Sequence, residues 1–110
     1  MNDLNSVLIE GTLTEDPILV DSDEGGTKCT FSLVTKRTTQ NGNTRASYFT
    51  VETGDRLAHN CSEYLRSNRG VRVVGYLAED NGKFTIHAEH VEFRPFRKPN
   101  QSAEVSVAAS

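Results

Sequence analysis

The sequence predicts an all-β protein that contains one helix, and three observations lead to this fold class. The chain has 110 residues, of which 35% are hydrophobic, and this length suits one domain with one core. Apolar and polar residues alternate over five separate segments, as they do in strands that bury one face. A further segment, between the third and fourth of these, has apolar residues at helical spacing. We therefore expect five strands and one helix within residues 1–93.

Each of the five predicted strands has one apolar face. The strands cover residues 6–13, 28–35, 48–53, 71–77 and 83–93. In the second strand, Cys29, Phe31 and Leu33 alternate with polar residues, which is typical of an antiparallel strand with one side in the core. In the first and fourth strands, Gly11 and Gly75 would allow the backbone to bend. These strands can therefore curl into a small barrel.

The last predicted strand changes the phase of its alternation. Apolar residues occupy even positions over 84–88 and odd positions over 91–93. One extra residue in a strand produces such a shift, so we expect a β-bulge near Glu89 and His90. The pattern assigns Phe84 to the start of the buried face, with a role as an exposed base-stacking ring as the alternative.

The predicted helix spans residues 54–70. Asp55 suits an N-cap or an acid in the first turn, and Gly70 suits the residue that closes the helix. Its apolar face consists of Leu57, Ala58, Cys61, Tyr64 and Leu65. Five strands with a helix between the third and fourth is the order of the OB-fold, a five-stranded Greek-key barrel. Residues 94–110 have two prolines and no periodic apolar face, so we expect a disordered C-terminal tail there.

Charge is distributed unevenly along the chain. The formal net charge is −3, which excludes a uniformly basic coat. Residues 1–35 have a balance of −6, whereas residues 36–72 have seven cations and three acids, a balance of +4. Such a distribution can place a positive groove on an acidic body.

No pattern in the sequence indicates catalysis, a cofactor or a metal site. The spacings of His59 with Cys61 and of His87 with His90 differ from those of structural zinc ligands. No nucleophile elbow or phosphate-binding loop is present. We therefore expect neither an enzyme nor a metalloprotein, and we expect the two cysteines, Cys29 and Cys61, to be core residues.

Two features bear on the cellular compartment. Two distant cysteines do not form a disulfide framework, which favours a reducing compartment. No segment has the ~20 apolar residues that cross a bilayer. We expect a soluble protein of the cytoplasm.

The basic segment is the most informative part of the chain. OB-folds bind single strands through phosphate contacts along a groove and through bases stacked on aromatic rings. Two tyrosines, Tyr48 and Tyr76, are the candidate rings. The candidate cations are Lys36, Arg37, Arg45, Arg56, Arg72 and Lys83.

Three stretches of the sequence resemble the bacterial single-stranded DNA-binding protein family. They are "LNSVLIEGTLTEDP", "CTFSLVTKR" and "YFTVETGDRLAHNCSEYLRSNRGVRVVGYL". The resemblance covers residues 4–93 in one order. It implies an OB-fold that binds single-stranded DNA without sequence specificity in DNA replication, repair and recombination, at the nucleoid. It also implies a homo-oligomer, either a tetramer or a dimer through the first strand.

The chain departs from the family pattern at its stacking residues. Thr38 and Thr39 stand where members place an aromatic residue, and Gly54 stands at another such place. The chain has no tryptophan, and its last residues, "AEVSVAAS", lack the acidic tip through which members recruit partners. We therefore expect weaker, more electrostatic DNA binding, and no recruitment of partners through such a tail.

A second interpretation follows from the same departures. An OB-fold paralogue could keep its barrel and oligomer interface while it binds DNA weakly or not at all, since this fold has many functions. The missing aromatic rings favour this interaction module, whereas Tyr48, Arg56 and the Lys36–Arg37 pair favour DNA binding.

Overall fold

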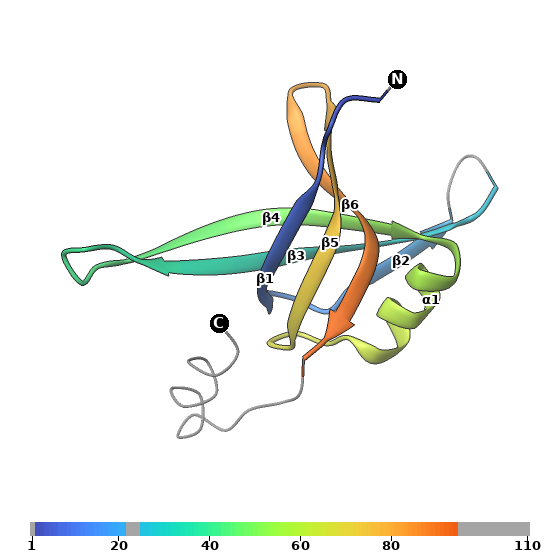
Figure 1. Cartoon of the computed structure of the whole chain (residues 1–110). Coiled ribbons are helices and arrows are strands. Elements are labelled where there is room, and N and C mark those ends of the chain that lie inside the picture. Colours follow the sequence, from blue (N-terminus) through green and yellow to red (C-terminus); the bar gives the residue numbers. More distant parts are fainter. Residues whose placement is uncertain (1, 22–24, 95–110) are drawn as a thin grey trace.

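A computed structural model describes residues 2–21 and 25–94, which form six strands and one helix (Figure 1). The elements are β1 (Val7–Leu13), β2 (Ile18–Asp21), β3 (Thr27–Thr38), β4 (Thr44–Gly54), α1 (Asp55–Tyr64), β5 (Gly70–Asp80) and β6 (Lys83–Phe93). Among the described residues, no helix is long and apolar enough to cross a membrane.

Five of the strands close into a barrel. The strand order is β1-β5-β6-β4-β3-β2, and a further pairing of β1 with β3 joins the ends of the five-stranded ring. Strands β4 and β6 pair in parallel, whereas the other pairs are antiparallel. The predicted barrel of five strands, with a helix between the third and fourth, is therefore confirmed.

Strand β2 is an addition that the sequence did not predict. It pairs only with β3, outside the ring of the barrel. All four of its side chains are exposed, so its sequence, "ILVD", has no alternation between a buried and a solvated face. Its strand conformation depends on hydrogen bonds to β3, and periodicity does not report such pairing.

The predicted bulge lies in β6. Val74 is opposite His90 and Gly75 is opposite Ala88, so Glu89 is the extra residue. At this point the two backbones approach closely, because a Cβ atom on Gly75 would collide with the carbonyl oxygen of His87. The change of phase in the sequence therefore located the bulge, and the structure adds the reason for a glycine next to it.

The core lies inside the barrel and under α1. It consists of Leu13, Cys29, Phe31, Leu33, Val51, Ala58, Cys61, Leu65, Val71, Val73, Ile86 and Val91. Cys29 and Cys61 are fully buried, as predicted, and burial raises the pKa of the Cys61 thiol to about 12. The assignment of Phe84 to the core is wrong, because 65% of this residue is exposed. Along β6 the buried face therefore begins at Ile86, one alternation later than the pattern indicated.

The helix is shorter than predicted. It begins at Asp55, an acid of the first turn with Gly54 as its N-cap, and it ends at Tyr64 instead of continuing to Gly70, which opens β5. Contacts with the β1–β2 connection divert the following residues: the Ser67 amide donates to Asp16 Oδ1 at 2.8 Å, and the Asn68 amide donates to the Leu13 carbonyl at 2.8 Å.

The last turn of the helix still receives a basic cap. Arg66 lies just after the helix and donates from Nη1 to the carbonyls of Ser62 (3.0 Å) and Leu65 (2.6 Å). The helical pattern assigned Tyr64 to packing, but this residue is 59% exposed. The centroid of its ring lies 6.3 Å from the centroid of the Phe93 ring.

Arg94 is the last residue that the structure describes. Arg94, the first residue of the predicted tail, donates its amide to the Gly70 carbonyl at 2.9 Å. Residues 95–110, which make up the rest of the predicted disordered tail, lie outside the described residues.

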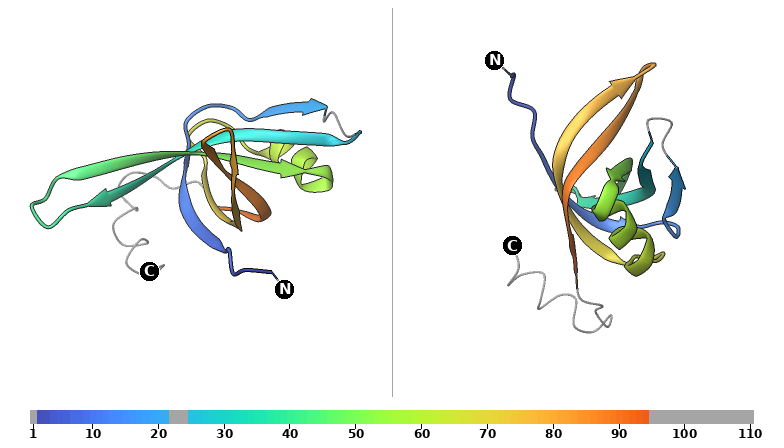
Figure 2. Two further views of the ribbon diagram at one scale, coloured as in Figure 1. Left: turned by 90° about the horizontal axis from the view of Figure 1, so that it is seen from above. Right: turned by 90° about the vertical axis from the view of Figure 1, so that its right-hand side faces the viewer.

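Two hairpins project from the barrel in different directions. The β3–β4 hairpin extends sideways, and the β5–β6 hairpin rises from the same body (Figures 1 and 2). We call residues 34–48, the projecting part of the β3–β4 hairpin, the arm. Every residue from Gln40 to Thr50 is exposed, so this part of the chain contributes little to the core.

Candidate nucleic-acid interface

The arm concentrates positive charge without acids. Residues 25–51 contain four cations and no aspartate or glutamate. Three of the cations, Lys36, Arg37 and Arg45, lie in the arm and are exposed. Among the residues that the structure describes, none of these three forms an ion pair. The arm is therefore a surface whose charge the described part of the chain leaves unbalanced.

Strand register brings two of these cations face to face. Arg37 and Arg45 are direct partners in the antiparallel β3–β4 ladder. Like charges in such a pair destabilise a sheet by roughly 0.2–1 kcal/mol, because partner Cβ atoms lie only about 5 Å apart. The sequence placed both residues near one loop but did not predict that they would be opposite each other.

The two faces of the arm carry different side chains. Side chains alternate between faces along a strand, and Val34 is the partner of Tyr48 while Lys36 is the partner of Ala46. Lys36 and Tyr48 therefore share one face, as diagonal neighbours, and the Arg37–Arg45 pair lies on the other. Tyr48 is 67% exposed, so its ring is available for stacking.

The other predicted residues lie away from the arm. Arg56 is exposed in the first turn of α1, at the end of β4 opposite to the arm. Lys83 and Tyr76 belong to the β5–β6 hairpin. The Tyr76 ring stacks on the ring of His87, with centroids 5.2 Å apart and planes 7° from parallel. The structure thus brings together Lys36, Arg37, Arg45 and Tyr48, and it leaves the other four candidates dispersed.

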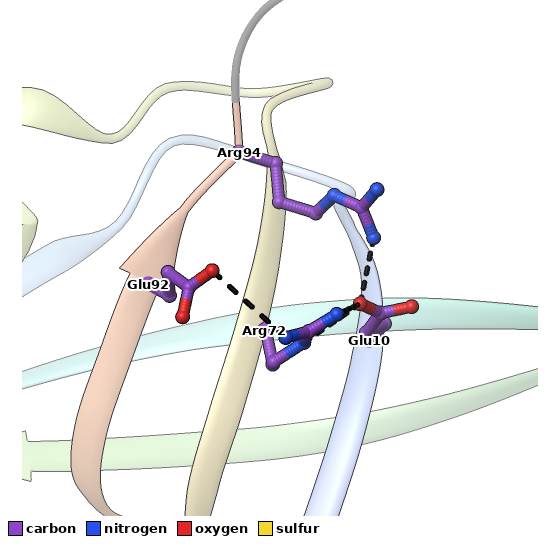
Figure 3. A network of polar contacts seen from close by, with 4 residues as sticks. All are labelled: Glu10, Arg72, Glu92 and Arg94. Carbon is purple, nitrogen blue, oxygen red and sulfur yellow. Dashed lines mark hydrogen bonds and ion pairs between the residues drawn. The ribbon is translucent and has the colours of Figure 1, made fainter. Parts of the chain in front are cut away.

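Arg72 belongs to a network of balanced charges on β1, β5 and β6 (Figure 3). Its Nη2 atom lies 2.6 Å from Glu10 Oε2, and its Nη1 atom lies 4.0 Å from Glu92 Oε1. Arg94 Nη1 approaches the same Glu10 oxygen at 2.7 Å. The hydrogen bond from Arg72 is the largest of the effects that hold the pKa of Glu10 below its ordinary value. We call these four residues the sheet network.

A groove of about 880 Å³ lies along β1 beside this network. Leu8, Ile9 and Glu10 of β1 line one side of it, and Lys36 and Arg69 line another. Strand β1 pairs with β5 along most of its length but with β3 only at Thr12 and Leu13. The groove therefore follows a strand edge that is largely unpaired among the described residues, and it carries charges of both signs.

Within the described residues, no group of three or more histidine, cysteine, aspartate or glutamate side chains could hold a metal ion. The interface is therefore built from the cations, the rings and the strand edge given above.

Comparisons with known proteins agree on one family. Residues 4–94 match the Single-strand binding protein family. The chain is 32% identical, over 114 aligned residues, to Single-stranded DNA-binding protein 2 of Chlorobaculum tepidum, and the match covers 91% of this chain and 77% of that protein.

Two crystal structures are also similar to this chain. The wild-type single-stranded DNA binding protein from Thermus aquaticus matches with a TM-score of 0.71 and 29% identity, over 87% of this chain and 42% of that one. A deletion mutant of the same protein matches with a TM-score of 0.73 and 27% identity, over 87% and 43%. The chain thus spans less than half the length of these two proteins.

Proposed function

Because the chain belongs to the Single-strand binding protein family, we propose that it binds single-stranded DNA without sequence specificity, chiefly through the arm. One observation carries this proposal: Arg37 and Arg45 face each other in the ladder, and the described residues supply no counter-charge. A phosphate between the two guanidinium groups would replace their repulsion with two charge-assisted contacts.

The arm suits a polyanion better than an ordered array of bases. Lys36 adds a cation on the opposite face, next to the exposed ring of Tyr48. Thr38 and Thr39 offer no ring for stacking. Since stacking supplies about 1–3 kcal/mol per base, binding at the arm depends mainly on phosphate contacts and is strongly dependent on salt.

The dispersed candidates take secondary roles in this proposal. We assign Arg56 of α1, and Lys83 and Tyr76 of the β5–β6 hairpin, to contacts with DNA that continues from the arm over the barrel. Arg72 contributes less, because Glu10 and Glu92 already balance its charge. Proteins of this family are not enzymes, and this chain acts by binding, without a cofactor, in DNA replication, repair and recombination at the bacterial nucleoid in the cytoplasm.

The unpaired edge of β1 supports a homo-oligomer. A strand with free backbone N–H and C=O groups is a template for another strand, and Leu8 is exposed beside it. In this proposal the chain forms a dimer through β1, and two dimers form a tetramer.

A salt series tests the proposal. Binding of oligo-dT roughly 30 nucleotides long is measured by fluorescence anisotropy from roughly 50 to 200 mM salt. We expect the wild-type affinity to fall steeply with salt. The triple variant Lys36→Ala, Arg37→Ala, Arg45→Ala should bind more weakly, with a log–log slope smaller by about 2, since each phosphate contact contributes ~0.7.

Lys28→Ala is the matched control. Lys28 lies on the same strand as Lys36 but pairs with Glu52 at 3.6 Å, so its loss should change the slope little. Binding that hardly varies with salt would overturn the phosphate contacts. No binding at the lowest salt would favour the alternative function, an oligomerisation module without strong DNA binding.

A further inference from the structure

The two projecting hairpins separate at one point, which we call the fork. Strands β4 and β6 pair in parallel only from Thr50 with Thr85 to Glu52 with His87. On the N-terminal side of these pairs, β4 continues into the arm and β6 continues into the β5–β6 hairpin (Figure 1). The residues immediately before the first pair are Phe49 and Phe84. An aromatic ring therefore stands on each branch of the fork.

Both rings belong to the core-facing side of their strands and lie at the edge of the core. Side chains two residues apart share a face, and the next residues on that face, Val51 and Ile86, are 0% and 2% exposed. Phe49 is 38% exposed and Phe84 is 65% exposed. On β6 the barrel interior thus begins at Ile86 and Phe84 contributes little packing to it, whereas Phe49 lies at the edge of the interior as the ladder partner of the fully buried Leu33.

The rings share a face with the arginine pair of the arm. Arg45, Ser47 and Phe49 occupy alternate positions of β4, and Arg37 is the partner of Arg45. The Arg37–Arg45 pair and the Phe49 ring therefore follow one another along one face, and Phe84 continues that face across the fork. Tyr48 and Lys36 occupy the opposite face.

We propose that Phe84, together with Phe49, forms a second base-stacking surface, on the face of the arm opposite to Tyr48. A single strand whose phosphates contact Arg37 and Arg45 then places its next bases on the rings at the fork. This inference rests on the proposed function, takes the stacking role that the sequence analysis gave as the alternative for Phe84, and adds Phe49 to it. A phenyl ring has no hydrogen-bonding group, so it stacks on any base and adds no sequence preference.

The charges of the β5–β6 hairpin orient such a strand. Glu79 accepts a hydrogen bond from the Gly82 amide at 2.7 Å, and Asp80 is the ladder partner of Lys83. With two acids and one cation near its turn, this hairpin repels phosphates overall. In this arrangement Lys83 makes no more than a secondary phosphate contact, the backbone of the DNA lies mainly on the side of the arm, and bases face Phe84.

Three substitutions at one residue test the stacking surface. Phe84→Ala removes the ring, Phe84→Leu keeps an apolar side chain, and Phe84→Tyr keeps the ring. We expect Ala and Leu to weaken oligo-dT binding by about ten-fold or more, the range for loss of a stacking ring, and Tyr to retain the wild-type affinity. The slope of log affinity against log salt should stay unchanged in all three, because no phosphate contact is lost.

Tyr64→Ala is the control, since this ring is 59% exposed but lies on α1, away from the fork. The Tyr64→Ala protein should bind oligo-dT with the affinity of the wild type. A second measurement requires no variant: oligonucleotides that contain 5-bromouracil are cross-linked by light to the wild-type protein. The modified peptides should include Phe49 or Phe84.

The outcomes separate this inference from the proposed function. Wild-type binding with an unchanged Phe84→Ala affinity, or cross-links that avoid both rings, would overturn the stacking surface and leave the proposed function in place. A Phe84→Leu protein that binds like the wild type would show an apolar contact without stacking, which also contradicts the inference. A Phe84→Ala protein that changes only its oligomeric state would identify the fork as a protein contact. A wild-type protein that does not bind DNA would overturn both.

Discussion

The arm and the sheet network both present arginines on exposed strands, but they treat the charge differently. In the sheet network, Arg72 and Arg94 lie within 2.7 Å of one oxygen of Glu10. In the arm, Arg37 and Arg45 face each other, and the described residues offer no acid. The number of cations does not distinguish these regions. The local supply of counter-charge does: it separates arginines paired within the fold from the arm arginines, which the proposed function assigns to phosphate contacts.

The difference also predicts how the two regions respond to change. The arm is exposed and adds repulsion to the folded state, so its cations are retained at a small cost in stability. The sheet network joins three strands of the barrel, so its charges act on stability. Substitutions should therefore separate binding from stability, and four experiments test this.

The largest effect is expected at the backbone of the sheet. Gly75→Ala would force a Cβ atom against the His87 carbonyl oxygen at the bulge, and we expect it to lower the free energy of unfolding by about 3 kcal/mol. Urea denaturation measures this loss. The folded fraction should still bind DNA with unchanged affinity, because the arm is untouched.

Gly42→Ala is the control for this substitution. Gly42 also lies in a hairpin, with φ of +84° but no atom within 4 Å of an added Cβ, so only its left-handed conformation penalises alanine, by about 1 kcal/mol. Equal losses at the two glycines would contradict the close approach at the bulge.

The next effect is on binding alone. The double variant Arg37→Glu, Arg45→Glu inverts the charge of the pair, and we expect roughly 100-fold weaker binding of oligo-dT at moderate salt. Its melting temperature should not fall, since a pair of like charges is replaced by another such pair. A melting temperature that falls together with the affinity would show that the arm is part of the stable framework.

A smaller effect is expected when the sheet network is made to resemble the arm. Glu10→Gln removes the carboxylate that Arg72 and Arg94 share, which leaves two arginines without their common partner. We expect a melting temperature lower by a few degrees, as for exposed ion pairs, and slightly tighter DNA binding at low salt. Glu63→Gln, which removes an exposed acid of α1, should leave the melting temperature unchanged.

The smallest effect is the pH dependence of the same carboxylate. The pKa of Glu10 lies below its ordinary value of 4.5 in the folded chain, mainly because Arg72 donates a hydrogen bond to it. A carboxyl group with a lower pKa in the folded state adds stability above its unfolded pKa and loses that stability as the pH falls through the folded value. The difference in melting temperature between the wild type and Glu10→Gln should therefore be present at about pH 7 and should shrink as the pH falls through the lowered pKa of Glu10. A difference that persists in acid would contradict the role of this charge.

Much of the barrel could be predicted from the sequence, because its strands alternate strictly wherever one face is buried. The change of phase located the bulge at Glu89 for the same reason. Strand β2 could not be predicted, since its side chains are all exposed. The end of the helix was also missed, because Asp16 and Leu13, distant in the sequence, bind the backbone that would have continued it.

The candidate site was predictable in composition but not in arrangement. The sequence shows that Lys36, Arg37 and Arg45 lie near one turn. It does not show that two of them are ladder partners, because that depends on the length and register of the hairpin. The exposure of Phe84 was only the alternative in the sequence analysis, because alternation reports which face a residue occupies, not where along the strand the buried face begins.

The closure of the barrel by β1 has a consequence for the order of folding. The β3–β4 and β5–β6 hairpins join neighbours in the sequence, so each can form early and locally. Strand β1 instead pairs with β5, for example Glu10 with Arg72, so the paired residues are separated by more than half of the chain. Contacts of such large sequence separation slow folding, because the entropy of loop closure is lost before they form. We expect the pairing of β1 to be the rate-limiting step of folding, with the arm already formed by then.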